Sequence, residues 1–84
     1  MSLLVIGPTY DMAVDACHAF GVSSRLHAVG AEANLSLAGR RDLVLIKVGR
    51  SEAWYELVKP EILRSISEQI EATRATVVNV EEWR

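Results

Sequence analysis

The chain has few of the residues and motifs that usually carry chemistry. It has one cysteine, Cys17, in 84 residues, so no disulfide forms within it, as is usual in a reducing compartment. Cys17 falls on the apolar side of a predicted helix, where a thiol acts as a small core side chain and not as a reactive nucleophile. His18 and His27 have no serine partner in a Gly-x-Ser-x-Gly turn. These absences predict that the protein is not an enzyme.

Motifs for metals, phosphates and dinucleotides are missing as well. Neither the Walker A pattern nor Gly-x-Gly-x-x-Gly occurs, so no cofactor is expected. Asp11, Asp15 and His18 follow one another along one face of a predicted helix. A metal site needs ligands that converge on one point, so a solvated helix face is the preferred interpretation and no metal is expected.

The charge balance gives no reason to bind nucleic acid. Nine Lys and Arg against eleven Asp and Glu leave a net charge of −2, whereas nucleic-acid binding calls for a clustered basic face. Four basic residues do gather near the ends of one predicted strand, and we interpret them as solvated strand-end charges: Arg40, Arg41, Lys47 and Arg50.

No hydrophobic run is long enough to cross a membrane. The apolar stretch Leu3–Ile6 is short and has no basic leader, whereas a membrane span takes about 20 residues and a signal peptide has a longer apolar segment. We therefore expect a soluble, cytoplasmic protein with no membrane partner. The length of 84 residues, with no linker-like segment, predicts one domain, 1–84.

Hydrophobic residues make up 50% of the sequence and gather in short runs that predict strands. The longest run, Asp42–Gly49, lacks polar alternation and is rich in β-branched residues, which indicates a strand buried on both faces. Leu3–Ile6 and Thr76–Val80 predict two more strands. Arg25–Val29 alternates polar and apolar residues, which predicts a strand at the edge of the sheet.

Helical patterns separate these strands. Thr9 or Asp11 can cap a first helix with its apolar face on residues 12–20. Residues 31–38 predict a second, short helix, and Pro60–Thr73 predicts the longest one, with proline in its first turn. Residues 52–58 fit either a short helix or an ordered loop.

Strands that alternate with helices predict an α/β fold with a parallel sheet, right-handed crossovers and helices on both faces. The two most apolar strands, Leu3–Ile6 and Asp42–Gly49, belong in the centre, and Arg25–Val29 belongs at an edge. The result is a small three-layer sandwich, Rossmann-like or flavodoxin-like, with a four-stranded parallel sheet in the order 2-1-3-4. The less favoured order 3-2-1-4 puts the best core strand at an edge.

The order 2-1-3-4 places a switch point between the first and third strands, and parallel sheets bind ligands at the carboxyl ends of strands that flank such a point. The residues there are Gly7, Thr9, Tyr10, Arg50 and Ser51. Backbone N–H groups, a hydroxyl and a guanidinium bind phosphate well, although Asp11 in the first helical turn opposes an anion. One function to test is therefore a module that binds or sequesters a nucleotide or other phosphorylated small molecule.

Three short motifs are Gly7-Pro8-x-Tyr10 after the first strand, Leu37-x-Gly39-Arg40-Arg41 before the third, and Val48-Gly49 at its end. With them the chain resembles small Rossmann-like proteins of unknown function encoded by bacteriophages of actinobacteria. The resemblance spans most of the chain and implies a small phage accessory protein that acts in the host cytoplasm. It carries over no catalytic residues, because none are established for such proteins.

The leading interpretation is a non-enzymatic protein that acts through protein–protein interaction. Large aromatic rings often anchor interfaces, and Trp54, Tyr55 and Trp83 fall outside the predicted central core. The last strand carries no charge to prevent edge pairing, and its Val78 is expected at an interface with a second copy. We therefore predict a homodimer that also meets an unidentified host or phage protein.

Overall fold

The computed structural model describes residues 2–31, 37, 39 and 41–81. Its elements are, in chain order, β1 (Ser2–Gly7), α1 (Tyr10–Phe20), α2 (Ser24–His27), β2 (Ala28–Gly30), β3 (Leu43–Val48), α3 (Ser51–Leu57), α4 (Pro60–Thr73) and β4 (Thr76–Val80).

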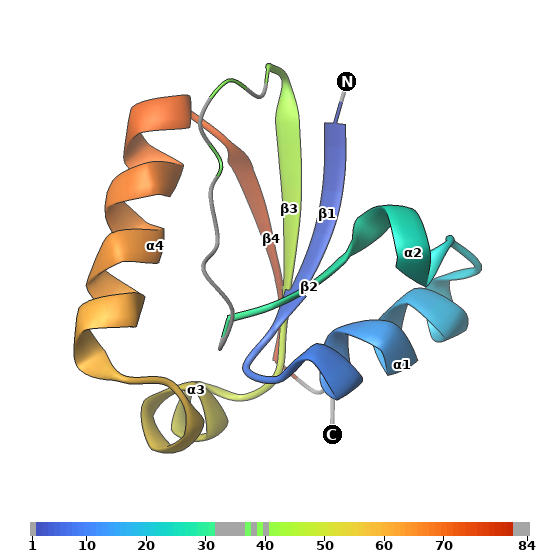
Figure 1. Cartoon of the computed structure of the whole chain (residues 1–84), viewed down its shortest axis with the longest axis horizontal. Helices are drawn as coiled ribbons and strands as arrows, with labels where there is room; N and C mark the ends of the chain where they lie inside the picture. The colour runs from blue at the N-terminus through green and yellow to red at the C-terminus, as the bar shows by residue number, and fades with distance from the viewer. Residues whose placement is uncertain (1, 32–36, 38, 40, 82–84) are drawn as a thin grey trace.

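The four strands form one parallel sheet in the order β2-β1-β3-β4. Helices α1 and α2 lie on one side of this sheet, and α3 and α4 lie on the other (Figure 1). The predicted α/β fold, the parallel sheet and the order 2-1-3-4 are therefore confirmed. The central strands β1 and β3 are the two apolar runs, because a central parallel strand is covered on both faces by helices.

Side chains of β3 alternate between the two layers. Leu43 and Leu45 pack into the cluster on the α4 side, which includes Ile66 of α4. Val48 packs with Ala16 and other α1 residues on the opposite side. This alternation places Lys47 on the α4 side of the sheet, in line with the two leucines.

The helix ends show why the helices begin and stop where they do. The Thr9 hydroxyl accepts a hydrogen bond of 3.3 Å from the Met12 N–H and so caps α1, as one of the two predicted caps. Gly21 ends α1 in the left-handed conformation, with a φ of 74°. Pro60 lies in the first turn of α4, as predicted, and Arg74 ends that helix with a φ of 54°.

The predicted strand Arg25–Val29 is wrong in its first half. The chain forms the short helix α2 up to His27, and β2 contains only Ala28–Gly30. His27 accounts for the difference, because its Nδ1–H donates a hydrogen bond of 2.9 Å to the Leu3 carbonyl oxygen of β1. The His27 side chain thus occupies the Leu3 carbonyl, a backbone group of β1 with which a longer β2 would pair.

Two further expectations concern the helices. Residues 51–57 are helical, which settles the choice between helix and loop left open for residues 52–58, and Arg50 is the N-cap residue. The helix predicted over 31–38 falls mainly on residues 32–36 and 38, which lie outside the described residues. Ala31 and Leu37 at its two ends are buried in the cluster on the α4 side.

Candidate functional site

The loops after β1 and β3 lie side by side at the carboxyl ends of the strands, as the strand order requires. A Cβ placed on Gly49 would lie 3.4 Å from Pro8 Cδ and 3.4 Å from Met12 Cε. Pro8 is itself fully buried. The switch point between β1 and β3 is therefore filled by protein side chains, which leaves little room there for a phosphate.

The first turn of α1 is packed closely against the sheet. A Cβ on Gly30 would lie 2.7 Å from the Tyr10 backbone nitrogen, and one on Gly7 would lie 3.0 Å from the Ala13 nitrogen. The Thr9 hydroxyl already accepts the Met12 N–H. The Thr9 hydroxyl, one of the groups predicted to hold a phosphate, is therefore already used to cap α1.

Arg50 and Ser51 line a separate, open hollow of about 280 Å³ together with Glu52 and Glu81. The two carboxylates oppose an anion in this hollow and offset the guanidinium. The five residues predicted to form one ligand site are therefore split between a filled crevice and a hollow with mixed charge. Within the part of the chain that the structure describes, no three His, Cys, Asp or Glu side chains could hold a metal ion.

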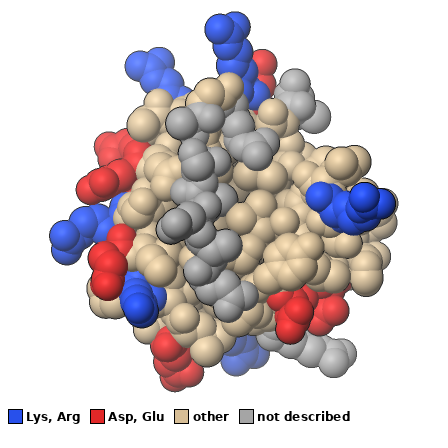
Figure 2. All heavy atoms as spheres, in the orientation of Figure 1, with Lys and Arg blue, Asp and Glu red and all other residues tan. Residues whose placement is uncertain are grey.

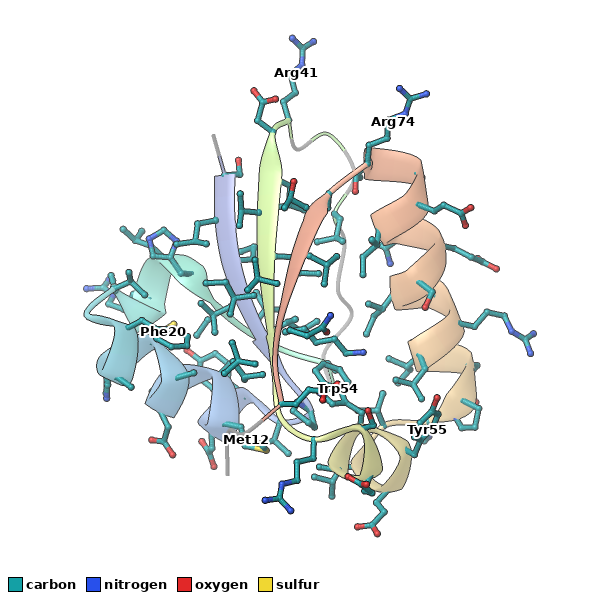
Figure 3. The ribbon with its side chains drawn as sticks, turned by 180° about the vertical axis from the view of Figure 1, so that it is seen from behind. Met12, Phe20, Arg41, Trp54, Tyr55 and Arg74 are labelled. Atoms are coloured by element: carbon teal, nitrogen blue, oxygen red, sulfur yellow. The ribbon has the colours of Figure 1, made fainter. Side chains whose placement is uncertain are left out.

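Trp54 corrects the expectation that its ring lies outside the core. The side chain is only 2% exposed and packs in the cluster on the α4 side of the sheet. Its Nε1–H donates a buried hydrogen bond of 2.9 Å to the Val48 carbonyl oxygen. Figure 3 shows Trp54 pointing inward and Tyr55 lying beside α3 and the start of α4. Trp54 therefore fixes α3 to the end of β3 and offers no ring to a partner.

The other residues predicted at an interface differ in their exposure. Tyr55 is 76% exposed and Val78 is 45% exposed. Trp83 lies outside the described residues. Of the predicted interface residues, Tyr55 and Val78 are thus the two that the structure places at the surface.

Strand β4 forms an edge of the sheet. Among the described strands it pairs only with β3. Gly49 N–H donates a hydrogen bond of 3.0 Å to the Val80 carbonyl oxygen, so Val80 directs its backbone groups toward β3. Because these directions alternate along a strand, Val78 also faces β3, whereas Val77 and Asn79 direct their backbone groups toward the outer edge.

The side chains of β4 give this edge an apolar face. Val80 packs against the cluster on the α1 side, and Val78 shares that face by alternation. Neighbouring Val44 and Ile46 on β3 are only half-buried. Helix α1 lies over β1 and β2, away from the β4 edge, as Figure 1 shows. The exposed Val78 is therefore the outermost part of an apolar stripe on β3 and β4.

On the face shown in Figure 2, Lys and Arg lie at separate places around the rim, and Asp and Glu lie near several of them. This face shows no basic cluster of the kind that contacts a nucleic-acid backbone. None of the described helices is long and apolar enough to span a membrane.

Two residues of functional interest were not predicted from the sequence. Lys47, interpreted as a solvated strand-end charge, is half-buried and its Nζ lies 4.7 Å from the centroid of the Trp54 ring. Lys47 shares one face of the strand with Leu43 and Leu45, at every second position, and this spacing in the sequence indicates that its side chain points inward. The backbone groups of Asn79 face the outer edge of β4, and only the strand register shows this direction.

Comparison with known proteins gives no relative: no protein family, curated protein or solved structure matches the chain. The resemblance to phage proteins remains a prediction. The function must therefore be argued from the geometry of the chain itself.

Proposed function

We propose that the protein is a non-enzymatic interaction module that forms a homodimer by pairing β4 with β4 of a second copy. The observation that supports this most directly is the uncharged outer edge of β4 with Val78 exposed beside it. Proteins usually block such an edge with a charged side chain, a proline or a covering segment, because unpaired backbone groups recruit another strand.

A two-fold axis at Val78 gives a specific antiparallel register. Val77 and Asn79 carry the outward backbone groups, and in this register Val77 of one copy exchanges both of its hydrogen bonds with Asn79 of the other. Val78 then faces Val78 of the second copy as a close, non-hydrogen-bonded pair. The exposed valine is buried at the centre of a continuous eight-stranded sheet.

Charge complementarity at the strand ends favours the same arrangement. Arg74 precedes β4 and Glu81 follows it, and both are exposed. Antiparallel pairing brings the start of one strand next to the end of the other, so Arg74 of each copy approaches Glu81 of the second copy. A parallel arrangement would place like charges together, which is unfavourable.

The test is sedimentation of the purified protein over a range of concentrations, with two variants at one position. Asn79→Pro removes an outward N–H and leaves the β3–β4 hydrogen bonds intact, because Asn79 does not face β3. Asn79→Ala keeps the N–H and serves as the matched control. We expect the wild type and Asn79→Ala to associate as dimers, and Asn79→Pro to remain a folded monomer.

The outcomes separate clearly. A wild-type protein that stays monomeric at the highest concentration overturns the proposal. So does an Asn79→Pro variant that dimerises as well as Asn79→Ala, because the interface then lies elsewhere. Amide exchange gives an independent check, since the Val77 and Asn79 amides gain protection only in the dimer.

A module for a nucleotide or other phosphorylated ligand has weaker support. Pro8 and Met12 fill the switch point, and Glu52 and Glu81 share the hollow with Arg50. A thermal-unfolding screen with nucleotides and sugar phosphates tests it, because a bound ligand raises the melting temperature. A shift that disappears in Arg50→Ala would favour this function over the interaction module.

A further inference from the structure

A pocket of about 150 Å³ lies between β3, α3 and α4, on the far side of the sheet from α1. It shares Ser51 with the hollow beside Arg50 and has no other lining residue in common with it. It is distinct from the outer edge of β4, so it carries an inference independent of the proposed dimer. Tyr55, Ser51 and Ser67 line it and are exposed, which places them at its mouth. The deeper walls are the buried Trp54 and Ile66.

Lys47 is the charged group of this pocket. It occupies a strand position whose neighbours on the same face, Leu43 and Leu45, are buried core residues. Lys47 is half-buried and its Nζ lies over the Trp54 ring. Among the described residues this ring is the interaction that the ammonium makes, and no carboxylate forms an ion pair with it. An ammonium that lies beside apolar walls, with no counter-ion among the described residues, favours an anionic ligand.

The walls opposite Lys47 are apolar. Leu63, Ile66 and Ile70 line the pocket from the inner stripe of α4. Such a surface gains little from a fully hydrated ion and much from an apolar body. At the mouth, the hydroxyls of Ser51 and Ser67 add neutral hydrogen-bond donors. The pocket therefore combines one positive charge, two hydroxyls and an apolar wall.

The size of the pocket limits the ligand. A cavity of about 150 Å³ holds a molecule the size of benzene, so a nucleotide does not fit. One ammonium balances a single negative charge better than a phosphate dianion. We propose that this pocket binds a small organic monocarboxylate with an apolar body, its carboxylate on Lys47 and its body against α4.

The experiment is a titration of the ¹⁵N-labelled protein with benzoate, followed by the shift of the Trp54 indole N–H signal. Benzamide is the neutral control, because it has the same shape and no charge. Lys47→Met removes the cation and keeps a long side chain, and Lys47→Arg restores a cation. Arg50→Ala is the matched control for loss of a nearby cation outside the pocket.

We expect saturable shifts with benzoate and a dissociation constant at least about tenfold higher in Lys47→Met, as for the loss of a charge-assisted hydrogen bond. Benzamide should bind at least about tenfold more weakly than benzoate. Lys47→Arg and Arg50→Ala should retain benzoate binding. If Lys47→Met does not fold, the benzoate and benzamide comparison on the wild type decides alone.

Three results would overturn the inference. Benzoate shifts that do not saturate mean that no site exists. Equal affinity for benzoate and benzamide means that the cavity is apolar only and Lys47 does not select charge. Shifts that disappear in Arg50→Ala but persist in Lys47→Met place the anion in the hollow beside Glu52 and Glu81.

Discussion

The indole N–H of Trp54 donates a 2.9 Å hydrogen bond to the carbonyl oxygen of Val48, the last residue of β3. This bond ties α3 to the strand six residues earlier in the chain. The same ring supports the Lys47 ammonium 4.7 Å from its centroid. The Trp54 side chain therefore fixes the turn after β3, packs in the core on the α4 side and forms one of the deeper walls of the pocket beside Lys47.

Replacing this ring tests its structural role. Trp54→Phe leaves the buried Val48 carbonyl without its donor and leaves space where the larger ring was, so we expect a loss of at least about 2 kcal/mol in the free energy of unfolding. Urea unfolding measures it. Tyr55→Phe is the neighbouring control and should change stability by less than about 0.5 kcal/mol, because that ring is 76% exposed. Equal effects would show that Trp54 is not a core anchor.

The sequence was sufficient for the sheet but not for the direction of the Trp54 ring. Short apolar runs separated by helical patterns define a parallel order with few alternatives, so β1, β3 and β4 were predictable. Residues 51–57 are too short for a clear helical period. The burial of Trp54, and of Val58 directly after the helix, shows which face of α3 points inward.

The segment before β2 shows a different limit. Alternation of polar and apolar residues predicted a strand from Arg25, yet a single side-chain bond from His27 to the Leu3 carbonyl accompanies a helical turn instead. Such a bond spans 24 residues of sequence. A contact of one side chain with a distant backbone group leaves no periodic signal in the sequence.

Gly30 makes a close approach that a side chain would prevent. A Cβ on Gly30 would lie 2.7 Å from the backbone nitrogen of Tyr10. Because this atom belongs to the backbone, it cannot move aside as the end of a flexible side chain could. We expect Gly30→Ala to destabilise the protein by about 1 to 3 kcal/mol through overpacking. Gly21→Ala is the comparison, because it has open space and only the cost of a left-handed residue, about 1 kcal/mol. Thermal unfolding of both variants measures the difference, and a smaller loss for Gly30→Ala would contradict the close contact.

Gln69 holds Leu37 against α4. Its Oε1 accepts a 2.7 Å hydrogen bond from the Leu37 N–H, which comes from a residue buried in the core. Gln69→Met removes the acceptor and should cost about 1 to 3 kcal/mol. Gln69→Glu keeps an acceptor oxygen and is the control. Hydrogen exchange of the Leu37 amide should speed up in Gln69→Met and stay slow in Gln69→Glu, and equal rates would show that another group protects it.

Cys17 makes the stability of the protein depend on pH in the alkaline range. Burial raises the pKa of this thiol, because the thiolate loses its hydration inside the core. At neutral pH and below, well under the ordinary cysteine pKa of about 8.5, the thiol is protonated in both the folded and unfolded states and contributes no slope. At higher pH the unfolded chain releases the proton while the folded chain retains it, so stability falls as pH rises.

The measurement is urea unfolding at several pH values for the wild type and Cys17→Ala. We expect the wild type to lose more stability than the variant above about pH 9, and the two to run parallel below about pH 8. Parallel curves across the whole range would mean that the thiol ionises equally well in both states. Cys17→Ala also removes a side chain from the core, so the slopes and not the absolute stabilities are compared.

A substitution at Val78 tests the association of two copies with little effect on the stability of the single chain. The side chain is 45% exposed in the single chain, so Val78→Lys should change the stability of the monomer by less than about 1 kcal/mol. In the proposed dimer the same residue faces its own copy across the two-fold axis, and two lysines there repel each other directly. Sedimentation should therefore show a monomer at concentrations where the wild type is a dimer. Leu26→Lys, at a 75% exposed position on α2, removes apolar surface away from β4 and should leave association unchanged. If Leu26→Lys disrupted the dimer and Val78→Lys did not, the contact would lie on the α2 side, and the open edge of β4 would need another explanation.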